Sequence, residues 1–456
     1  MADINIINGQ VLIPEIGIRN VCLSLSGGKI VAIAERDQLP SASETIDASG
    51  LVVMPGIIDP HVHLGFCQGF ESDCKTETRS ALLGGVTTIG CYLGGTELHS
   101  KTFPDIEQCI NTHAYTDIFP HLCINTEEQR QEIPEYIERL GVTSFKFFMF
   151  CIPGYMPSQT NSFILSGFRE VAQFGSECFC SVHAEDPSMI LDGWNEFFQK
   201  GKKSLSEWAD SNPSEAEVLG AIVASSLAEI SGCRINIVHL ATSAALKKLR
   251  VIKRENPLVT VETLALYLSV HSSSPVEATE ARWSPAVRGP EDQEALWEGV
   301  RDGTIFTIGT DQDCVDRAGL EQFIKDYGVS GSSAIDALFL PLLLTEGYHK
   351  RNIPLEKLVE KVTLNPARLW GIYPRKGTIS VGSDADLVLV DVNKEFQADH
   401  RKLLSAADWS LYQGKELKGQ PMITIKNGKV VMKEGKIIED RNLGRCLRKR
   451  RPTISG

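Results

Sequence analysis

The stretch LVVMPGIIDPHVHLGF (residues 51–66) begins with an apolar run typical of a buried strand and ends with His61 and His63. Side chains two residues apart in a β-strand point to the same face, so both imidazoles project in one direction. Two imidazoles in that arrangement suit a metal ion. Because such a pair also arises by chance, further ligands must be sought elsewhere in the chain.

Seven more apolar runs follow, separated by segments with helical periodicity. They are VTTIGCYLG (86–94), TDIFPHLCI (116–124), VTSFKFFMF (142–150), CFCSVHAE (178–185), RINIVHLA (234–241), LVTVETLAL (258–266) and TIFTIGTD (304–311). Apolar strands that alternate with helices indicate parallel strands buried on both faces, and eight such units predict a (β/α)8 barrel. A doubly wound open sheet is the alternative, which the absence of G-x-G-x-x-G after an early strand disfavours.

The two ends of the chain show a different pattern of short strands and tight turns. Asn8-Gly9 and Gly27-Gly28 suit hairpins, and IINGQVLI (6–13) resembles IKNGKVVM (425–432). We therefore expect one small β-sandwich built from both ends. The predicted organisation is a β-sandwich domain from residues 1–52 and 377–438, a barrel from residues 53–376, and a basic C-terminal tail from residues 439–456.

Composition restricts the class of protein. The 456 residues are 42% hydrophobic and 23% charged, as in soluble globular proteins. The net charge of -12 argues against a nucleic-acid surface, and no apolar stretch is long enough to cross a membrane. The start of the chain lacks the features of a secretory signal, and the twelve cysteines are scattered without a C-x-x-C pair. We expect a cytoplasmic protein with reduced thiols, whose basic tail segment RCLRKRR (445–451) is solvated or lies at a subunit contact.

Polar side chains stand where the predicted barrel strands end, which is where barrels of this class carry their functional residues. A single histidine or aspartate there is more often structural, but a coincidence of several at one rim is improbable. The candidates are His61, His63, Lys146, His183, His239 and Asp311.

Lys146 is the most unusual of these residues, because Phe145, Phe147 and Phe148 surround it in sequence. An unpaired buried ammonium is costly, so this lysine should be neutral, paired with a carboxylate or chemically modified. Reaction with carbon dioxide would turn it into a carbamate, an anionic oxygen ligand able to bridge two metals. Nitrogen and oxygen ligands of this kind suit two divalent ions, Zn²⁺ first, with Mn²⁺, Fe²⁺ or Co²⁺ as alternatives. Two such ions lower the pKa of a shared water.

The motifs PGIIDPHVH, SFKFFM, SVHAED, INIVHLA and TIGTD resemble the metal-ligand motifs of the amidohydrolase superfamily in its cyclic-amidase branch. The segment TLNPARLWGIYPRKGTISVGSDADLVLVD (363–391) is similar to the hydantoinase/dihydropyrimidinase family in particular. The resemblance covers nearly the whole chain. It implies a metal-dependent hydrolase that opens a hydantoin- or dihydropyrimidine-type ring by attack of a metal-bridging hydroxide on a ring carbonyl. It also implies a homotetramer or dimer.

The resemblance assigns a role to each candidate ligand. His61, His63 and Asp311 would hold one ion, and His183 and His239 the other. Lys146, as N6-carboxylysine, would bridge the two ions, and Asp311 would also carry a proton to the leaving nitrogen. Two alternatives stay open. One is a cyclic amidohydrolase for another ring, such as allantoin, an imide or an oxidised purine. The other is a silent scaffold of the same fold, although such relatives lose ligands and here all six positions are filled.

The residues expected to bind substrate depart from the family. A tyrosine five residues after the bridging lysine is replaced by Cys151, whose thiol is a weak donor, and Tyr155 is the candidate substitute. Ser284 in RWSPAVRG matches the serine that binds substrate through its backbone, and Tyr327 in DYGVSGSS falls near a second such position.

Two further departures concern charge. Gln312 replaces a histidine that follows the strand-end aspartate in many hydantoinases. Leu64, Gly65 and Phe66 replace the arginine of dihydroorotases, which argues against a dihydroorotate substrate, although Arg282 or Arg288 could supply that charge.

Overall fold

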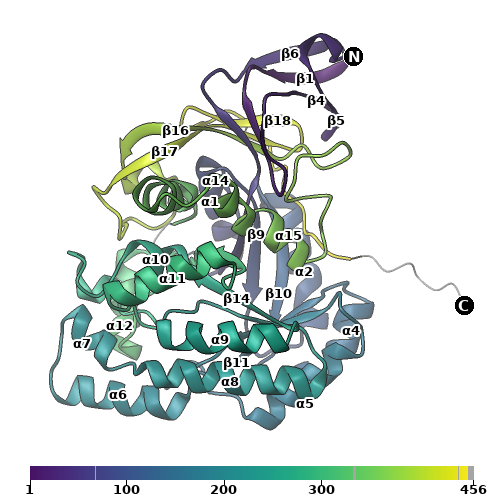
Figure 1. Ribbon diagram of the computed structural model, residues 1–456. Helices are drawn as coiled ribbons and strands as arrows, with labels where there is room; N and C mark the ends of the chain where they lie inside the picture. The colour runs from purple at the N-terminus through teal and green to yellow at the C-terminus, as the bar shows by residue number, and fades with distance from the viewer. Residues whose placement is uncertain (67, 332–334, 440, 450–456) are drawn as a thin grey trace, which may run out of the picture. The chain divides into compact units, whose positions relative to one another are not determined.

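The computed structural model describes residues 1–66, 68–331, 335–439 and 441–449, and Figure 1 shows the chain. An eight-stranded sheet runs in sequence order from β8 to β15, and its strands pair in parallel from β10 through β15. Its strands are β8 (Ile57–Val62), β9 (Val86–Leu93), β10 (Asp117–Cys123), β11 (Ser144–Phe148), β12 (Phe179–His183), β13 (Ile235–Ile237), β14 (Val259–Leu264) and β15 (Thr307–Gly309). Each of the eight predicted runs contains one of them, so the predicted (β/α)8 barrel is confirmed.

The first run, LVVMPGII, contains two strands rather than one. Val52–Pro55 forms β7, which belongs to a different sheet, and β8 begins after Gly56. A Cβ at Gly56 would lie 2.2 Å from the hydroxyl of Thr87, so only glycine fits between the two strands. The predicted domain boundary between residues 52 and 53 thus falls inside β7.

Helices separate the barrel strands, as the periodicity predicted, and four more (α12 to α15) follow the last barrel strand. They are α1 (Phe70–Ala81), α2 (His99–His113), α3 (Glu127–Gln131), α4 (Ile133–Glu138), α5 (Asn161–Ala172), α6 (Pro187–Gln199), α7 (Leu205–Asp210), α8 (Ser214–Ser231), α9 (Ser243–Glu255), α10 (Ala265–Ser269), α11 (Pro290–Asp302), α12 (Arg317–Tyr327), α13 (Phe339–Leu343), α14 (Leu355–Lys361) and α15 (Leu364–Leu369). Short 3-10 helices lie at Arg36–Gln38, Leu82–Gly84, Ala278–Glu280, Asp336–Leu338 and His400–Lys402, and a π-helix spans Leu344–His349.

Side-chain caps begin two of the helices immediately after barrel strands. Asp186 accepts hydrogen bonds from the backbone N–H groups of Ser188 and Met189 at the start of α6, and Thr242 accepts one from Ala245 at the start of α9. These caps lie three residues after His183 and His239, respectively. The turn from strand to helix is therefore fixed close to both candidate ligands.

The remaining strands form two sheets that combine both ends of the chain. One sheet has the order β5-β4-β1-β6, and the other has the order β19-β18-β17-β16-β7-β2-β3. The strands are β1 (Ala2–Ile7), β2 (Gln10–Ile13), β3 (Gly17–Arg19), β4 (Cys22–Ser26), β5 (Lys29–Ala34), β6 (Ala42–Asp47), β7 (Val52–Pro55), β16 (Leu387–Gln397), β17 (Glu416–Lys426), β18 (Lys429–Lys433) and β19 (Lys436–Ile437). The antiparallel pairing of β7 with β16 joins the N-terminal and C-terminal parts directly.

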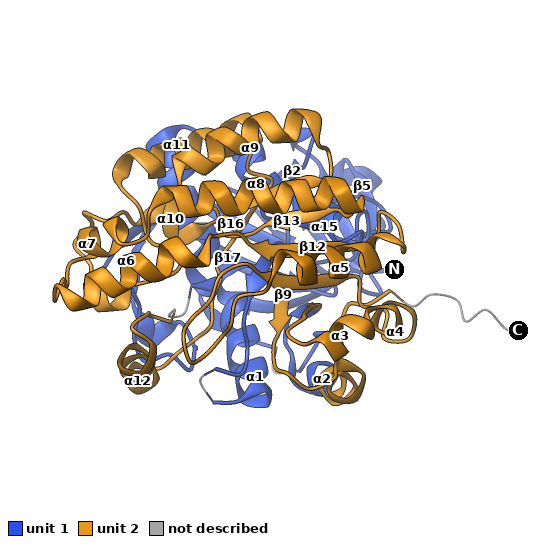
Figure 2. Ribbon diagram, turned by 90° about the horizontal axis from the view of Figure 1, so that it is seen from below, with its two compact units in different colours: residues 1–90, 109–118, 333–445 blue, residues 91–108, 119–332, 446–456 orange. Residues whose placement is uncertain are grey.

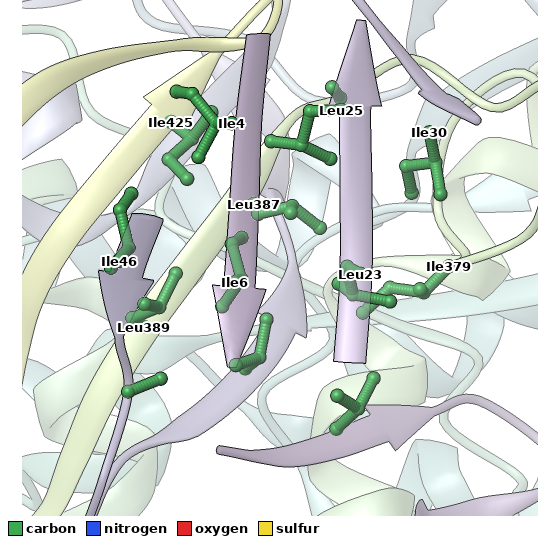
Figure 3. Close-up of a cluster of buried hydrophobic side chains, with 14 of the residues drawn as sticks. Ile4, Ile6, Leu23, Leu25, Ile30, Ile46, Ile379, Leu387, Leu389 and Ile425 are labelled. Atoms are coloured by element: carbon green, nitrogen blue, oxygen red, sulfur yellow. The ribbon is translucent and has the colours of Figure 1, made fainter. Parts of the chain in front are cut away.

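An apolar core lies between these two sheets (Figure 3). Ile4 and Ile6 come from β1, whereas Leu387 and Leu389 come from β16, and both pairs are spaced two residues apart. Alternate residues of a strand share one face, so each strand contributes its apolar face to the common core. The expected small β-domain from both chain ends is confirmed.

One of the two predicted hairpins is wrong. Gly27-Gly28 does connect β4 and β5, with Ser26 paired to Lys29. Asn8-Gly9 instead carries the chain from one sheet to the other, because β1 pairs with β4 and β6 whereas β2 pairs with β3 and β7. A Cβ at Gly9 would lie 2.8 Å from the Cβ of Ala48, so close packing between the sheets, rather than strand pairing, requires glycine there.

The chain divides into two compact units (Figure 2). Unit 1 comprises residues 1–90, 109–118 and 333–445, and contains the β-domain together with β8 and α1. Unit 2 comprises residues 91–108, 119–332 and 446–456, and contains β11 to β15, with α8 packed against α5 and α9. No helix in the described part of the chain is long and apolar enough to cross a membrane.

The basic tail contacts the chain itself. In unit 2, the Arg448 guanidinium lies 2.6 Å from the Glu107 carboxylate, and the Lys449 ammonium lies 3.2 Å from that of Glu177. The backbone N–H of Lys449 donates to the carbonyl of Gly141 at 3.0 Å. These residues are thus not simply solvated. Arg450 and Arg451 of the predicted basic cluster lie outside the described residues.

Candidate metal centre

His61 and His63 stand at the end of β8 in unit 1. Their ring centroids are 5.3 Å apart, as the two-residue spacing predicts. His61 is buried and His63 is partly exposed. Asp59, two residues earlier, is also buried, and its Oδ1 accepts the backbone N–H of His61 at 3.0 Å. The strand end that carries both imidazoles is therefore fixed by a buried carboxylate.

A second buried carboxylate holds the loop after these histidines, and sequence reasoning missed it. Asp73 in the first turn of α1 accepts the backbone N–H groups of Gly65 at 2.9 Å and Gln68 at 3.0 Å. An aspartate in the first turn of a helix, just after a glycine-containing loop, is the sequence signal that could have identified it.

His183 and His239 come together in unit 2, at the ends of β12 and β13. Their ring centroids are 4.3 Å apart, and both side chains are buried. The ring of His183 also stacks on Phe150 at 4.3 Å. The Nε2 of His183 donates to the buried Glu185 carboxylate at 2.8 Å, which leaves the Nδ1 lone pair for a metal ion. Burial lowers the pKa of His183, which favours the neutral form that ligates metals.

Lys146 lies on β11 and is 1% exposed. Its Nζ is 4.9 Å from the ring centroid of Tyr92 and 5.3 Å from that of Phe148. None of the ion pairs among the described residues includes this lysine. Burial lowers the pKa of Lys146 to about 8, against the opposing charges of Asp311, Cys123 and Glu262. A substantial fraction of the amine is then neutral near pH 8, and the neutral amine is the form that reacts with carbon dioxide.

Asp311 and His239 share an unusual backbone conformation. Their φ angles are 56° and 44°, in the left-handed region that residues other than glycine seldom adopt. Such conformations carry a cost of about 1–3 kcal/mol and cluster at functional sites. Each of the two residues lies two positions after the end of a three-residue parallel strand.

Glu262 is another group that sequence reasoning missed. It lies on β14, is completely buried, and accepts the hydroxyl of Thr307 at 3.2 Å. Burial raises the pKa of Glu262 to about 8, although the charge of Lys146 lowers it. A glutamate within the apolar run LVTVETLAL is as anomalous as a lysine among phenylalanines, and it could have been singled out on that ground.

The predicted substrate residues have different neighbours: Ser284 contacts Glu185, whereas Tyr155 and Tyr327 pack against each other. The Ser284 hydroxyl donates to Glu185 at 3.3 Å, so one carboxylate contacts both Ser284 and the candidate ligand His183.

Tyr155 is 45% exposed, and its ring lies 5.2 Å from the ring of Tyr327. Burial of its hydroxyl, together with the charges of Asp313 and Cys123, raises the pKa of Tyr155 to about 12. Cys151 is itself buried, and burial raises the pKa of its thiol.

The other polar candidates are buried. Arg282 lies over the ring of Phe197 at 5.2 Å, and Arg288 donates to the backbone carbonyls of Ala209 and Asn212. Both guanidinium groups thus have contacts within unit 2. Gln312 is fully buried, and its backbone N–H donates to the Thr310 hydroxyl at 3.2 Å.

Three clustered aspartates in unit 1, Asp117, Asp384 and Asp386, also have the chemistry of a metal site. Two lysine ammonium groups already lie among them. Lys376 and Lys426 approach the Asp117 carboxylate at 2.7 and 2.8 Å, respectively. This cluster is therefore an ion-pair network rather than a metal site.

Known proteins resemble this chain over nearly its whole length. The sequence model of the amidohydrolase family matches residues 182–432. An L-hydantoinase of Paenarthrobacter aurescens is 28% identical over 96% of both chains, and a D-hydantoinase of Rhizobium radiobacter is 30% identical over 95% of this chain and 96% of the relative. A crystal structure of a D-hydantoinase superposes with a TM-score of 0.90 at 28% identity over 99% of both chains.

Proposed function

Because this chain belongs to the amidohydrolase family, we propose that it is a metal-dependent cyclic amidohydrolase acting on a hydantoin- or dihydropyrimidine-type ring. The relatives that it matches over nearly their full length are hydantoinases. The observation that carries the proposal is the set of nitrogen and oxygen donors at the carboxyl ends of strands of one parallel sheet. That is the edge where barrel enzymes place their active sites.

The donor set fits two divalent cations. We assign His61, His63 and Asp311 to one ion, and His183 and His239 to the other, with carboxylated Lys146 as the bridge. His61, His63 and Asp311 form one of the two groups of potential metal ligands among the described residues. Imidazole and carboxylate donors suit Zn²⁺ first, with Mn²⁺, Fe²⁺ or Co²⁺ as alternatives. When bound, such ions polarise a carbonyl and lower the pKa of a water molecule.

The residues of the chain would then position substrate and move protons. The Asp311 carboxylate would take a proton from the attacking water and return it to the ring nitrogen as the carbon–nitrogen bond breaks. Because the pKa of Tyr155 is about 12, its hydroxyl stays protonated at neutral pH and can donate to the developing oxyanion. Ser284 would orient the ring through its backbone. Glu185, which accepts hydrogen bonds from both Ser284 and His183, would hold these two residues in fixed positions.

The test is a ring-opening assay on zinc- or manganese-loaded protein. The substrates are dihydrouracil, 5-substituted hydantoins, allantoin, dihydroorotate and simple cyclic imides, and the product is read as a carbamoyl or carboxylate group. We expect turnover of hydantoins or dihydrouracil. Turnover of another ring alone would reassign the substrate class. Silence across the panel with two ions per chain would contradict the proposed substrates.

We also propose a cytoplasmic homotetramer or dimer. Every described cysteine is a free thiol, as expected in a reducing compartment. The mass in solution, measured by light scattering after gel filtration, tests the assembly; a monomer would contradict it.

A further inference from the structure

Helix α8 (Ser214–Ser231) contacts the backbone that follows both histidines of unit 2. The backbone N–H of Asp186, three residues after His183, donates to the carbonyl of Ala216 at 2.9 Å. Figure 2 shows α8 as one long helix of unit 2. Its first two turns therefore lie against the segment that leaves β12.

Glu217 on this helix clamps the segment that leaves β13. It is 2% exposed. One carboxylate oxygen accepts the backbone N–H of Ala241 at 2.8 Å, and the other accepts the backbone N–H of Thr242 at 2.8 Å and also the Thr242 hydroxyl. Hydrogen bonds to an ionised carboxylate are stronger than those between neutral groups. Two of these bonds fix the backbone two and three residues after His239, and the third holds the side chain of Thr242.

Gly220 lies three residues further along α8, on the same face of the helix. A Cβ there would stand 2.3 Å from both the carbonyl carbon and the carbonyl oxygen of Ala184, the residue after His183. The helix backbone and the strand-end backbone are thus in direct contact. One rigid helix consequently supports the carboxyl ends of both β12 and β13.

We propose that Glu217 is a positioning residue for the second metal ion. Through its three hydrogen bonds it holds His239 at the distance from His183 that one ion requires, while Gly220 lets α8 support His183 from the same face. Glu217 thereby sets the affinity of the site for that ion without touching it. The inference rests on the proposed two-metal function.

Glu217→Gln tests this role, with Glu77→Gln as its matched control. Glutamine keeps the volume but replaces one acceptor oxygen with a donor, which cannot accept a backbone N–H. Glu77 on α1 is also a buried carboxylate, and it accepts the N–H of Ala406 at 2.9 Å and the Ser405 hydroxyl at 2.8 Å. The control thus loses the same chemistry at a place that holds no candidate ligand.

The measurement is zinc content per chain by mass spectrometry, together with zinc affinity by chelator competition, on apoprotein reconstituted with Zn²⁺ and bicarbonate. We expect two ions in the wild type and in Glu77→Gln. In Glu217→Gln we expect one ion to remain tight and the other to bind about 10- to 100-fold more weakly. Wild-type affinity for both ions in Glu217→Gln would overturn the inference. A wild type that binds fewer than two ions would instead refute the proposed function.

A milder pair of variants keeps the test decisive if Glu217→Gln does not fold. Thr242→Val removes the hydroxyl bond to Glu217 and also the cap of α9. Thr160→Val removes the equivalent cap of α5, where Thr160 accepts the N–H of Phe163 at 3.3 Å, together with an exposed contact to the Ser162 hydroxyl at 3.0 Å. We expect weaker binding of one ion in Thr242→Val and wild-type binding in Thr160→Val. Equal affinities in the two variants would overturn the inference.

Discussion

Two buried lysines, one in each unit, have opposite surroundings. Lys146 in unit 2 is 1% exposed and lies beside aromatic rings, and burial lowers its pKa to about 8. Lys376 in unit 1 is 4% exposed and contacts three aspartates: Asp117 at 2.7 Å, Asp384 at 3.2 Å, and Asp386. Burial alone would lower the pKa of Lys376, but the three carboxylates outweigh it and raise the pKa.

The contrast is between an amine with a lowered pKa and a cation held by carboxylates. A buried ammonium that meets several carboxylates keeps its proton and stabilises the elements that it joins. A buried amine among aromatic rings loses its proton more easily and becomes a nucleophile. A lysine with the same degree of burial is therefore suited to act as a nucleophile in unit 2 and to stabilise the packing of elements in unit 1.

The largest expected effect is that of Lys146→Ala. The variant should lose both metal ions and all turnover, because the bridging oxygens disappear with the amine. Short carboxylic acids such as formate or propionate should restore part of the activity by standing in for the carbamate. Metal content and hydantoin turnover are measured with and without the acid, and full activity without additive would show that Lys146 is not the bridge.

Asp311→Asn tests the proposed proton transfer in unit 2. Asp311 is also one of the charges that raise the pKa of Lys146. An amide cannot take up the proton, so kcat should fall by about 10²- to 10⁴-fold. Most of the metal should stay bound. Steady-state kinetics measure kcat, and metal analysis measures the ions bound per chain. A wild-type kcat would exclude the proton-transfer role.

Lys376→Met should damage unit 1 without affecting the chemistry. Removing one partner of a buried ion-pair network leaves uncompensated carboxylates and should lower the free energy of unfolding by about 3–5 kcal/mol. Metal content and kcat per folded chain should equal those of the wild type. Denaturant unfolding gives the first quantity, and a loss of metal at full folding would contradict the structural assignment of this lysine.

The smallest expected effect concerns acid stability. Burial would raise the pKa of Asp386, but Lys376 and Lys426 outweigh it and lower the pKa below its usual value near 3.8. Its stabilising contribution is therefore complete above about pH 4 and is lost as the pH falls through the lowered folded-state pKa. Asp386→Asn should cost about 1.5–3 kcal/mol at pH 7, and the difference from wild type should shrink below pH 4. A difference that is constant from pH 7 to pH 3 in urea unfolding would contradict this.

Patterns local in sequence predicted most of the fold. Eight apolar runs predicted eight barrel strands, and the spacing of His61 and His63 predicted two adjacent imidazoles, because strand periodicity alone fixes which side chains share a face. The pattern failed where one run contains two strands, β7 and β8. It also failed at Asn8-Gly9, since the choice between a hairpin and a crossover depends on which distant strands pair.

The supporting carboxylates could not be predicted in the same way. Glu217 acts on Ala241 and Thr242, and Glu185 acts on Ser284, across long separations in the chain. Nothing in the residues around these glutamates indicates their partners. The sequence flags Lys146 by its phenylalanine neighbours, yet the residues around Lys376 in YPRKGT do not even indicate burial.

The amino-acid sequence by itself determined the barrel, the β-domain from both chain ends and the candidate ligands, because side-chain periodicity and donor chemistry are properties of short segments. The tertiary structure alone decided which buried lysine contacts carboxylates, which carboxylates hold the strand ends, and that Cys151 is packed while Tyr155 is half exposed. Those outcomes depend on burial and on charges brought together from distant segments, and the free energy of a buried charge is set by neighbours that only folding supplies.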